Sequence, residues 1–161
     1  LVKHALYMRP QHLIVGECRG EETVELFSAL GAGHDGALMT VYGCSLRDCL
    51  RRLEMMGATE EAKLSVSTVR EQIARCLDVL VYVSRTRDGS YKVRNIAEVV
   101  GVEADVIRLQ SIFHYRDEGM DKKTGKVKGT FERSGFCPTF LTRLEARGIE
   151  LSSEMFMLRP A

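Results

Sequence analysis

The chain has 161 residues, of which 45% are apolar and 28% charged, and its formal net charge is +1. This length is enough for one buried core, so we expect one domain or a piece of one. The composition is ordinary for a globular protein, which excludes a disordered polymer and a strongly basic nucleic-acid-binding tail. The first residue is Leu1 and not Met. We therefore expect a fragment, a trimmed chain or a partly ordered one.

The cysteines favour reduced thiols in a cytosolic protein over a disulfide framework or a zinc site, because their number is odd and none form a C-x-x-C pair. The five are Cys18, Cys44, Cys49, Cys76 and Cys137. The longest apolar run, residues 77–83, contains Asp78 and is too short to cross a bilayer. No signal peptide is recognisable.

Short apolar strands alternate with amphipathic helices in the first half of the chain. Strands are predicted at residues 13–15 and 38–42, and helices at 21–32, 45–57 and 66–76. Ser45 is a predicted N-cap with Asp48 as its capping-box partner, and Gly57 is expected to end that helix. Apolar residues at helical spacing are expected to face inward: Val24, Phe27 and Leu30; Leu46, Cys49, Leu50 and Leu53; Val66, Val69, Ile73 and Cys76. This alternation predicts an α/β layered domain with parallel pairing.

Antiparallel ribbons are predicted in the second half. Strands are expected at 79–85, 92–99 and 106–115, turns at 87–90 and 122–126, and a last helix at 137–147 with Gly148 as its cap. The chain is therefore expected to consist of an α/β part, about residues 1–78, and a part with antiparallel strands and a terminal helix, about 79–161.

Two glycine patterns imitate nucleotide-binding motifs. Residues 31–36 match G-x-G-x-x-G, but a helix comes before them and a strand after, which reverses the dinucleotide-binding order. Residues 119–127 approach a P-loop, but the glycine spacing is one residue too long and Val127 replaces the Ser or Thr that would bind magnesium. We interpret the first as a helix-to-strand loop and the second as a turn, so no phosphate-cradling loop is expected in this sequence.

Residues 9–20 carry the most informative pattern, an apolar strand at 13–15 followed by a glycine, a carboxylate and an arginine. A carboxylate at the carboxyl end of a parallel strand lies where ligands bind. There it can order a water against a phosphate or reach magnesium through water. The residues by themselves favour a simpler interpretation, a helix start in which Glu17, Glu21 and Glu22 interact well with the helix dipole.

The sequence resembles the type II and type IV secretion ATPases, and most closely the branch that assembles tight-adherence (Flp) pili. The segment from Met8 to Gly20 resembles the family's Walker B region, and Gly33-His34-Asp35-Gly36 with Thr40 resembles its histidine box. Further matching segments follow in order: 45–48, 52–54, 70–74, 87–90 and 98–101. The resemblance runs to about Phe113 and, more loosely, through the final helix.

The resemblance implies a ring-shaped, usually hexameric ATPase with a RecA-like motor domain. Glu17 matches the Walker B glutamate, the candidate catalytic residue that positions the attacking water. Arg19 matches the following arginine, which faces phosphate or a neighbouring subunit. His34 matches the first histidine of the histidine box, a γ-phosphate sensor. Thr40 matches the threonine of the following strand, and Tyr42 stands where the family has a second histidine, close to His34.

Structural alternatives stay open at these positions. Arg19 can pair with Glu21 or Glu22, and His34 can bond to the backbone. The sequence also departs from the family, because Gln11 replaces an Asp and Tyr42-Gly43-Cys44 replaces His-Ala-Asn. Tyrosine donates a hydrogen bond but does not titrate near neutral pH. A slow enzyme, a divergent branch and a member that binds nucleotide without much turnover all agree with these departures.

We expect part of an ATP-hydrolysing motor that powers pilus assembly or type II/IV secretion, with ATP and Mg2+ held by an upstream P-loop. The expected partners are further copies of the chain in a ring and an inner-membrane platform protein, at the cytoplasmic face of the membrane. The chain alone is expected not to hydrolyse ATP. The alternative is a non-hydrolysing ring or scaffold component. A nucleic-acid-translocating motor is disfavoured, because no basic stripe interleaved with aromatics is present.

Overall fold

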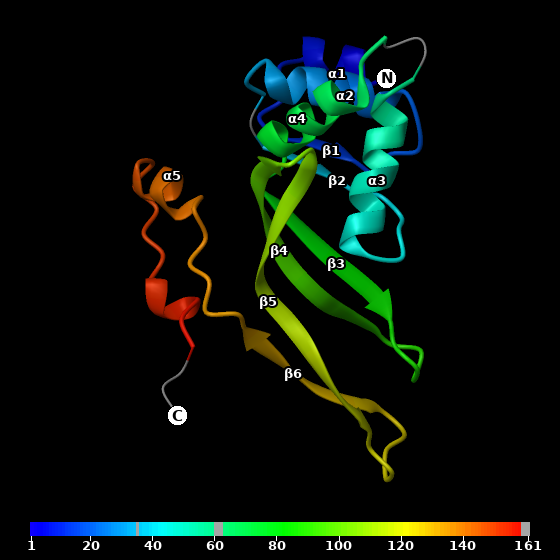
Figure 1. Ribbon diagram of the computed structural model, residues 1–161, viewed down its shortest axis with the longest axis vertical. Coiled ribbons are helices and arrows are strands. Elements are labelled where there is room, and N and C mark those ends of the chain that lie inside the picture. Colours follow the sequence, from blue (N-terminus) through cyan, green and yellow to red (C-terminus); the bar gives the residue numbers. More distant parts are fainter. Residues whose placement is uncertain (35, 60–62, 159–161) are drawn as a thin grey trace. The chain divides into compact units, whose positions relative to one another are not determined.

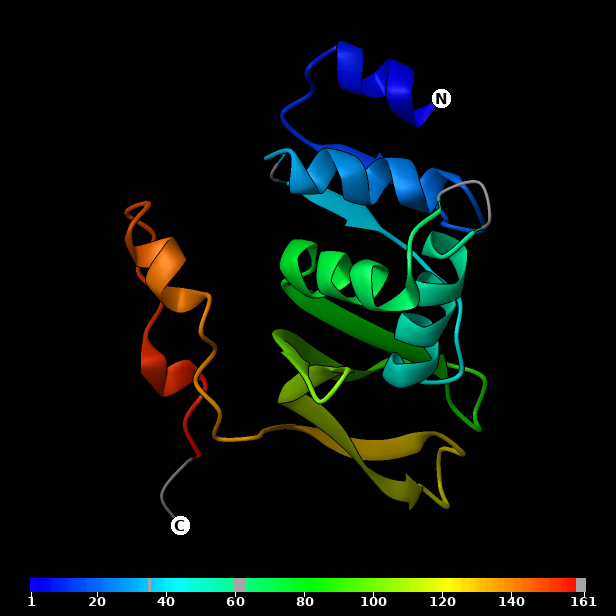
Figure 2. The same cartoon turned by 45° about the horizontal axis from the view of Figure 1, so that its top comes forward.

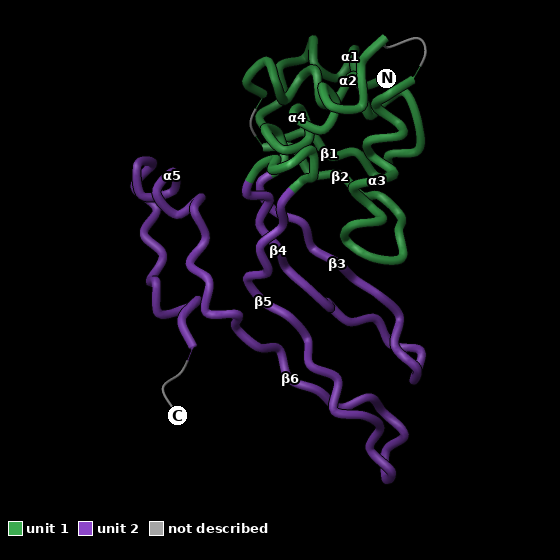
Figure 3. The backbone as a smooth tube through the Cα atoms, in the orientation of Figure 1, with its two compact units in different colours: residues 1–77, 101–107 green, residues 78–100, 108–161 purple. Residues whose placement is uncertain are grey.

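The structure is a computed structural model that describes residues 1–34, 36–59 and 63–158. It divides into two compact units, residues 1–77 with 101–107, and residues 78–100 with 108–161 (Figure 3). In chain order, the elements of the first unit are α1 (Val2–Tyr7), β1 (Leu13–Val15), α2 (Glu22–Gly31), β2 (Ala37–Met39), α3 (Leu46–Gly57) and α4 (Val66–Cys76) (Figure 1).

The first unit is built on a parallel pair of strands. Leu13 lies opposite Ala37 and Val15 opposite Met39, so the predicted parallel pairing is confirmed. Figure 2 shows α2 lying along β1 and β2. The alternate residues Ile14 and Leu38 are 71% and 63% exposed, so no part of the described chain covers this face of the pair.

The core of the first unit lies among α2, α3 and α4, which pack against one another. Its most deeply buried side chains are Leu26, Phe27, Leu53, Val69 and Ile73. Helix α4 has the predicted bounds, but Val66 does not face inward as predicted and is 46% exposed. Val66 is the first residue of the helix, where the chain has only begun to approach the core.

The second unit is an antiparallel meander in the order β3-β4-β5-β6, as the ribbon prediction implied. The strands are β3 (Val79–Arg85), β4 (Tyr91–Glu103), β5 (Val106–Met120) and β6 (Val127–Arg133). Strand β5 runs five residues beyond the predicted end, because its polar end pairs with β6 although it lacks an apolar alternation. Residues 121–126 form the connecting turn, as predicted in place of a P-loop.

The terminal segment contains α5 (Leu141–Glu145) and a 3-10 turn, η1 (Ser153–Met155). Helix α5 is shorter than predicted, because a residue before proline avoids helical geometry and Cys137 precedes Pro138. The carboxylate of Glu98, which is 2% exposed, binds the segment just before this helix. It accepts hydrogen bonds from the Thr139 amide (3.0 Å), the Thr139 hydroxyl (2.6 Å) and the Phe140 amide (3.0 Å).

A second carboxylate, Asp88, fixes the turn between β3 and β4. It accepts hydrogen bonds from the Thr86 hydroxyl (2.6 Å) and from the amide and hydroxyl of Ser90 (3.0 and 2.7 Å). Its other oxygen accepts from the Val127 amide at 2.7 Å, which joins this turn to the start of β6. These donors, that of Thr86 first, hold the pKa of Asp88 well below its ordinary value of 3.8.

We predict that Asp88→Asn lowers the free energy of unfolding at neutral pH. Because the folded-state pKa is depressed, the stabilisation by Asp88 is present above the unfolded-state pKa of about 4 and is lost as the pH falls below it. The difference between wild type and variant should therefore stay constant from neutral pH to about pH 5 and narrow from there to about pH 3 in urea titrations. Glu145→Gln, at an exposed position of α5, is the control. A difference that stays constant between about pH 5 and pH 3 would contradict the role of the ionised carboxylate.

Candidate functional site

The parallel pair places its following loops at one sheet edge. The amide of Thr40 donates to the Val15 carbonyl (3.3 Å), and the amide of Cys18 donates to the Thr40 carbonyl (2.8 Å). The Thr40 hydroxyl also donates to the Gly16 carbonyl. Backbone pairing thus continues past both strands, and Glu17 lies beside Thr40 at the carboxyl edge. Because β1 and β2 are parallel, their carboxyl ends lie at the same edge of the pair.

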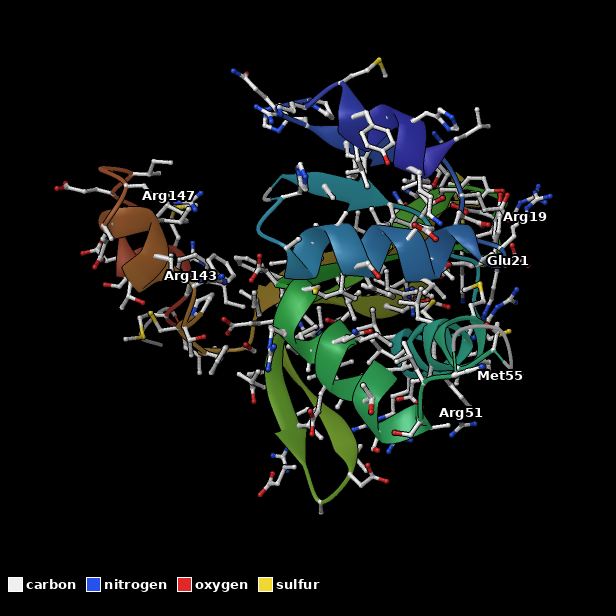
Figure 4. The ribbon with its side chains drawn as sticks, turned by 90° about the horizontal axis from the view of Figure 1, so that it is seen from above. Arg19, Glu21, Arg51, Met55, Arg143 and Arg147 are labelled. Atoms are coloured by element: carbon white, nitrogen blue, oxygen red, sulfur yellow. The ribbon has the colours of Figure 1, made fainter. Side chains whose placement is uncertain are left out.

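Arg19 forms an ion pair with Glu17. The Glu17 side chain is 23% exposed and the Arg19 side chain 76%. The pKa of Arg19 is raised, first by its hydrogen bond to Glu17 and then by the charge of Glu17, with smaller effects of Tyr42 and Glu22. The alternative that the Arg19 guanidinium pairs with Glu21 or Glu22 is therefore wrong. Figure 4 shows Arg19 and Glu21 near the start of α2.

Glu22 fixes the loop between β1 and α2. Its Oε1 accepts hydrogen bonds from the Arg19 amide and from the Gly20 amide (3.0 Å). The pKa of Glu22 is lowered, chiefly by the Arg19 amide. The sequence predicted only a favourable interaction of Glu22 with the helix dipole and missed this hydrogen-bonding role. The sequence could have predicted this role, since a carboxylate at a helix start can reach back to free backbone N–H groups.

The loop after β2 leads from the sheet edge into α3. Tyr42 is 66% exposed there. Ser45 caps α3 as predicted, because its hydroxyl accepts from the Asp48 amide at 3.1 Å. The Asp48 carboxylate departs from the predicted capping box, since it accepts from the Cys44 amide at 2.8 Å. This hydrogen bond holds Cys44, the residue before the N-cap, and so fixes the loop that carries Tyr42.

His34 lies at the opposite end of the strand pair. It precedes β2, and its amide donates to the Ala29 carbonyl at 3.2 Å. With Leu6, Tyr7, Arg9 and Pro10 it lines a cavity of about 400 Å³.

The predicted closeness of His34 and Tyr42 is therefore wrong, because the whole of β2 runs between them. The structure brings together Glu17, Arg19, Thr40 and Tyr42, whereas His34 and Arg9 line the cavity at the other end of the strand pair. Asp35 of the histidine-box segment lies outside the described residues.

The remaining chemistry at this edge is limited. Burial raises the pKa of the thiols of Cys18 and Cys49, so they stay protonated and unreactive near neutral pH. Among the described residues, no group of three or more His, Cys, Asp or Glu side chains could hold a metal ion. In the same part of the chain, no helix has the length and apolar character required to cross a membrane.

Comparison with known proteins assigns the family. Residues 1–130 match the model of the family described as type II/IV secretion system protein. A putative conjugal transfer protein of Mycobacterium tuberculosis is 36% identical over 121 residues, which cover 74% of this chain and 33% of that protein. An uncharacterized protein of Methanocaldococcus jannaschii is 33% identical over 157 residues, 96% of this chain and 51% of that protein. The type IV secretion system protein PtlH of Bordetella pertussis is 30% identical, with coverage of 62% and 30%.

The fold also matches a solved structure. The VirB11 ATPase of the Brucella suis type IV secretion system, crystallised with sulphate, superposes with a TM-score of 0.56 at 22% identity. The match covers 60% of this chain and 30% of that one. The chain belongs to the type II/IV secretion ATPase superfamily, and its fold is the RecA-like fold of this neighbour. It spans about a third of the length of the mycobacterial relative.

Gly43 is the position in the loop after β2 where packing excludes a side chain. A Cβ at Gly43 would lie 2.5 Å from the Cys49 Sγ and 3.0 Å from the Cys49 amide. We predict that Gly43→Ala lowers the free energy of unfolding by about 1–3 kcal/mol through overpacking.

Urea unfolding measures this effect. Gly31→Ala is the matched control, because nothing lies within 4 Å of a Cβ there. A Gly43→Ala protein as stable as wild type would show that α3 does not constrain the loop.

Proposed function

We propose that the chain is the part of an ATP-hydrolysing ring motor that supplies the water-positioning carboxylate, Glu17. The observation that carries the proposal is the location of Glu17 beside Thr40 at the carboxyl edge of a parallel strand pair, in a member of the secretion ATPase superfamily. Ligands of open α/β sheets bind at this edge.

The proposed chemistry follows from the side chains at the edge. Phosphoryl transfer to water requires positioning and charge stabilisation, with little covalent participation by the protein. Glu17 would orient the attacking water, and Arg19 would turn from Glu17 towards the phosphate. The Thr40 hydroxyl donates a hydrogen bond to the Gly16 carbonyl, so its role is to keep the two loops together. Tyr42 offers an exposed phenol as a neutral hydrogen-bond donor.

ATP and Mg2+ would be held mainly by another part of the protein. The pattern at 119–127 that approaches a P-loop is the turn between β5 and β6 and does not begin a helix. Of the groups at the site edge, Glu17 fits a water-mediated contact to Mg2+, since carboxylate oxygens suit this ion. When bound, Mg2+ would neutralise charge that develops on the phosphate.

The proposed partners are other copies of the chain and an inner-membrane platform protein, with the motor at the cytoplasmic face of the membrane. Tight-adherence pilus assembly is the branch we propose, within a machine for pilus assembly or type II/IV secretion. Support comes from relatives described as conjugal transfer and type IV secretion system proteins.

A second candidate is a non-hydrolysing ring or scaffold component. The observation that favours it is that Glu17 is already paired with Arg19, while Tyr42 stands where the family has a histidine. Both features would slow a water-activating site.

We predict that Glu17→Gln in the full-length protein lowers steady-state ATP turnover on the order of 100-fold or more, because the amide cannot accept a proton from water. Nucleotide binding, measured in parallel, should persist. Glu21→Gln, on the exposed loop next to the site, should retain activity. The purified 161-residue chain should show no magnesium-dependent turnover. A wild-type full-length protein that binds but does not hydrolyse ATP would establish the scaffold alternative.

We also propose different roles for Tyr42 and His34, which the position of β2 between them supports. Tyr42→Phe should lower turnover roughly threefold to tenfold, the effect of one neutral hydrogen bond. Tyr42→His should keep or raise turnover, and His34→Ala should have the smaller effect, because His34 lies at the other end of β2. Turnover of the three variants in the assembled ring measures this. A larger loss from His34→Ala than from Tyr42→Phe would reverse the assignment.

A further inference from the structure

A cleft of about 170 Å³ lies in the first unit, and none of the residues proposed for ATP hydrolysis lines it. It opens between α3, α4 and the turn that joins β4 to β5. The side chains that give it its chemical character are Arg47, Arg51, Glu54, Arg70, Asp105 and Val106. Leu50 and Ile107 are buried at its floor, with 4% and 2% of their surface exposed.

Arg70 and the two carboxylates of the cleft bind one another. The guanidinium of Arg70 meets both oxygens of Glu54, at 3.0 and 3.1 Å. Its Nη1 lies 2.6 Å from the Asp105 carbonyl and 2.6 Å from the Asp105 carboxylate. These bonds, those of Glu54 first, raise the pKa of Arg70. They also anchor a turn in which Ala104 and Asp105 both adopt left-handed backbone geometry, with φ of 46° and 60°.

Arg47 and Arg51 are not neutralised in the same way. Both are exposed and line the cleft, and within the described residues neither makes an ion pair. They are four residues apart on α3 and therefore lie on one face of the helix, where like charges repel. Two adjacent guanidinium groups beside a cavity form a fork-shaped set of donors that matches an oxyanion.

The charge of the cleft selects among oxyanions. Its three guanidinium groups and two carboxylates leave one net positive charge. A carboxylate carries one negative charge and balances it. A phosphate with two negative charges would instead be repelled by the Asp105 carboxylate, whose side chain is 71% exposed.

Beyond the cleft, α3 exposes an apolar side chain, Met55. Met55 follows Arg51 by four residues and is 71% exposed, and Val106 at the cleft is 46% exposed. Figure 4 shows Arg51 and Met55 both extending outward from α3. An occupant that matches this surface has a carboxylate and an apolar side chain about one helical turn apart, roughly 6 Å along the axis.

We propose that this cleft is a docking site for an acidic segment of a partner protein. One carboxylate of the segment binds between Arg47 and Arg51, and an apolar side chain one turn away packs on Met55. This interaction does not depend on ATP hydrolysis, and it adds a recognition surface on α3 to the site at the sheet edge.

The test uses the full-length protein and a fluorescein-labelled helical peptide with Glu and Leu four residues apart in an Ala/Gln background. Fluorescence anisotropy should show binding, which Arg47→Gln with Arg51→Gln weakens roughly tenfold or more, because charge-assisted hydrogen bonds are lost. The wild-type protein should bind a peptide with Gln in place of Glu about as weakly as the double variant binds the Glu peptide. Met55→Ala should also reduce affinity, while ATP turnover stays unchanged in every variant.

Arg52→Gln is the matched control, because Arg52 is an exposed neighbour on α3 that does not line the cleft. Arg47→Glu with Arg51→Glu should reverse the preference and bind a peptide with Lys in place of Glu. Absence of binding, equal binding of the Gln and Glu peptides, or a loss from Arg52→Gln as large as that from Arg47→Gln with Arg51→Gln would overturn the proposal. Full displacement of the peptide by millimolar inorganic phosphate would also overturn it, since the cleft would then be a site for free oxyanions.

Discussion

The backbone pairing of β1 and β2 beyond their ends is the constraint on which the candidate site depends. Each strand has three residues, too few to position a site by themselves. The bonds between Cys18 and Thr40, and between Gly16 and the Thr40 hydroxyl, extend the pairing into both loops. Because Glu17 lies between the two bonded residues of its loop, its backbone is fixed while its side chain stays accessible. A short sheet edge thereby holds a carboxylate in a defined place without burying it.

The ion pair of Glu17 with Arg19 is compatible with a working carboxylate, because its energy is small. Solvent screens exposed ion pairs, which therefore contribute little to stability, and the Arg19 side chain is 76% exposed. A phosphate with two negative charges attracts the guanidinium more strongly than one carboxylate does. Under the proposed function, arrival of the phosphate would move Arg19 and release Glu17 for water.

Local periodicity predicted much of the fold, and non-local bonds account for what it missed. Helix α4 and strand β3 have their predicted bounds, because apolar spacing and caps act within a few residues. The separation of His34 from Tyr42 was hidden, since eight residues in sequence can form a loop or cross a sheet. The bonds of Arg70 to Asp105 and of Glu98 to Thr139 join residues 35 and 41 positions apart. No spacing rule pairs such residues, so the cleft on α3 could not be predicted from the sequence.

The charged side chains divide into two groups by how many partners they have. Asp88 and Glu98 use their carboxylates to bind backbone and hydroxyl donors of distant segments, and their bonds are consumed in maintaining the fold. Such groups cannot bind a ligand without releasing a segment of chain. Arg19, by contrast, has one ion-pair partner, Glu17, and Arg47 and Arg51 make no ion pair within the described residues. Ligand binding costs these arginines little existing structure. Under both proposals, the sheet edge and the cleft are the places where charged side chains are available to another molecule.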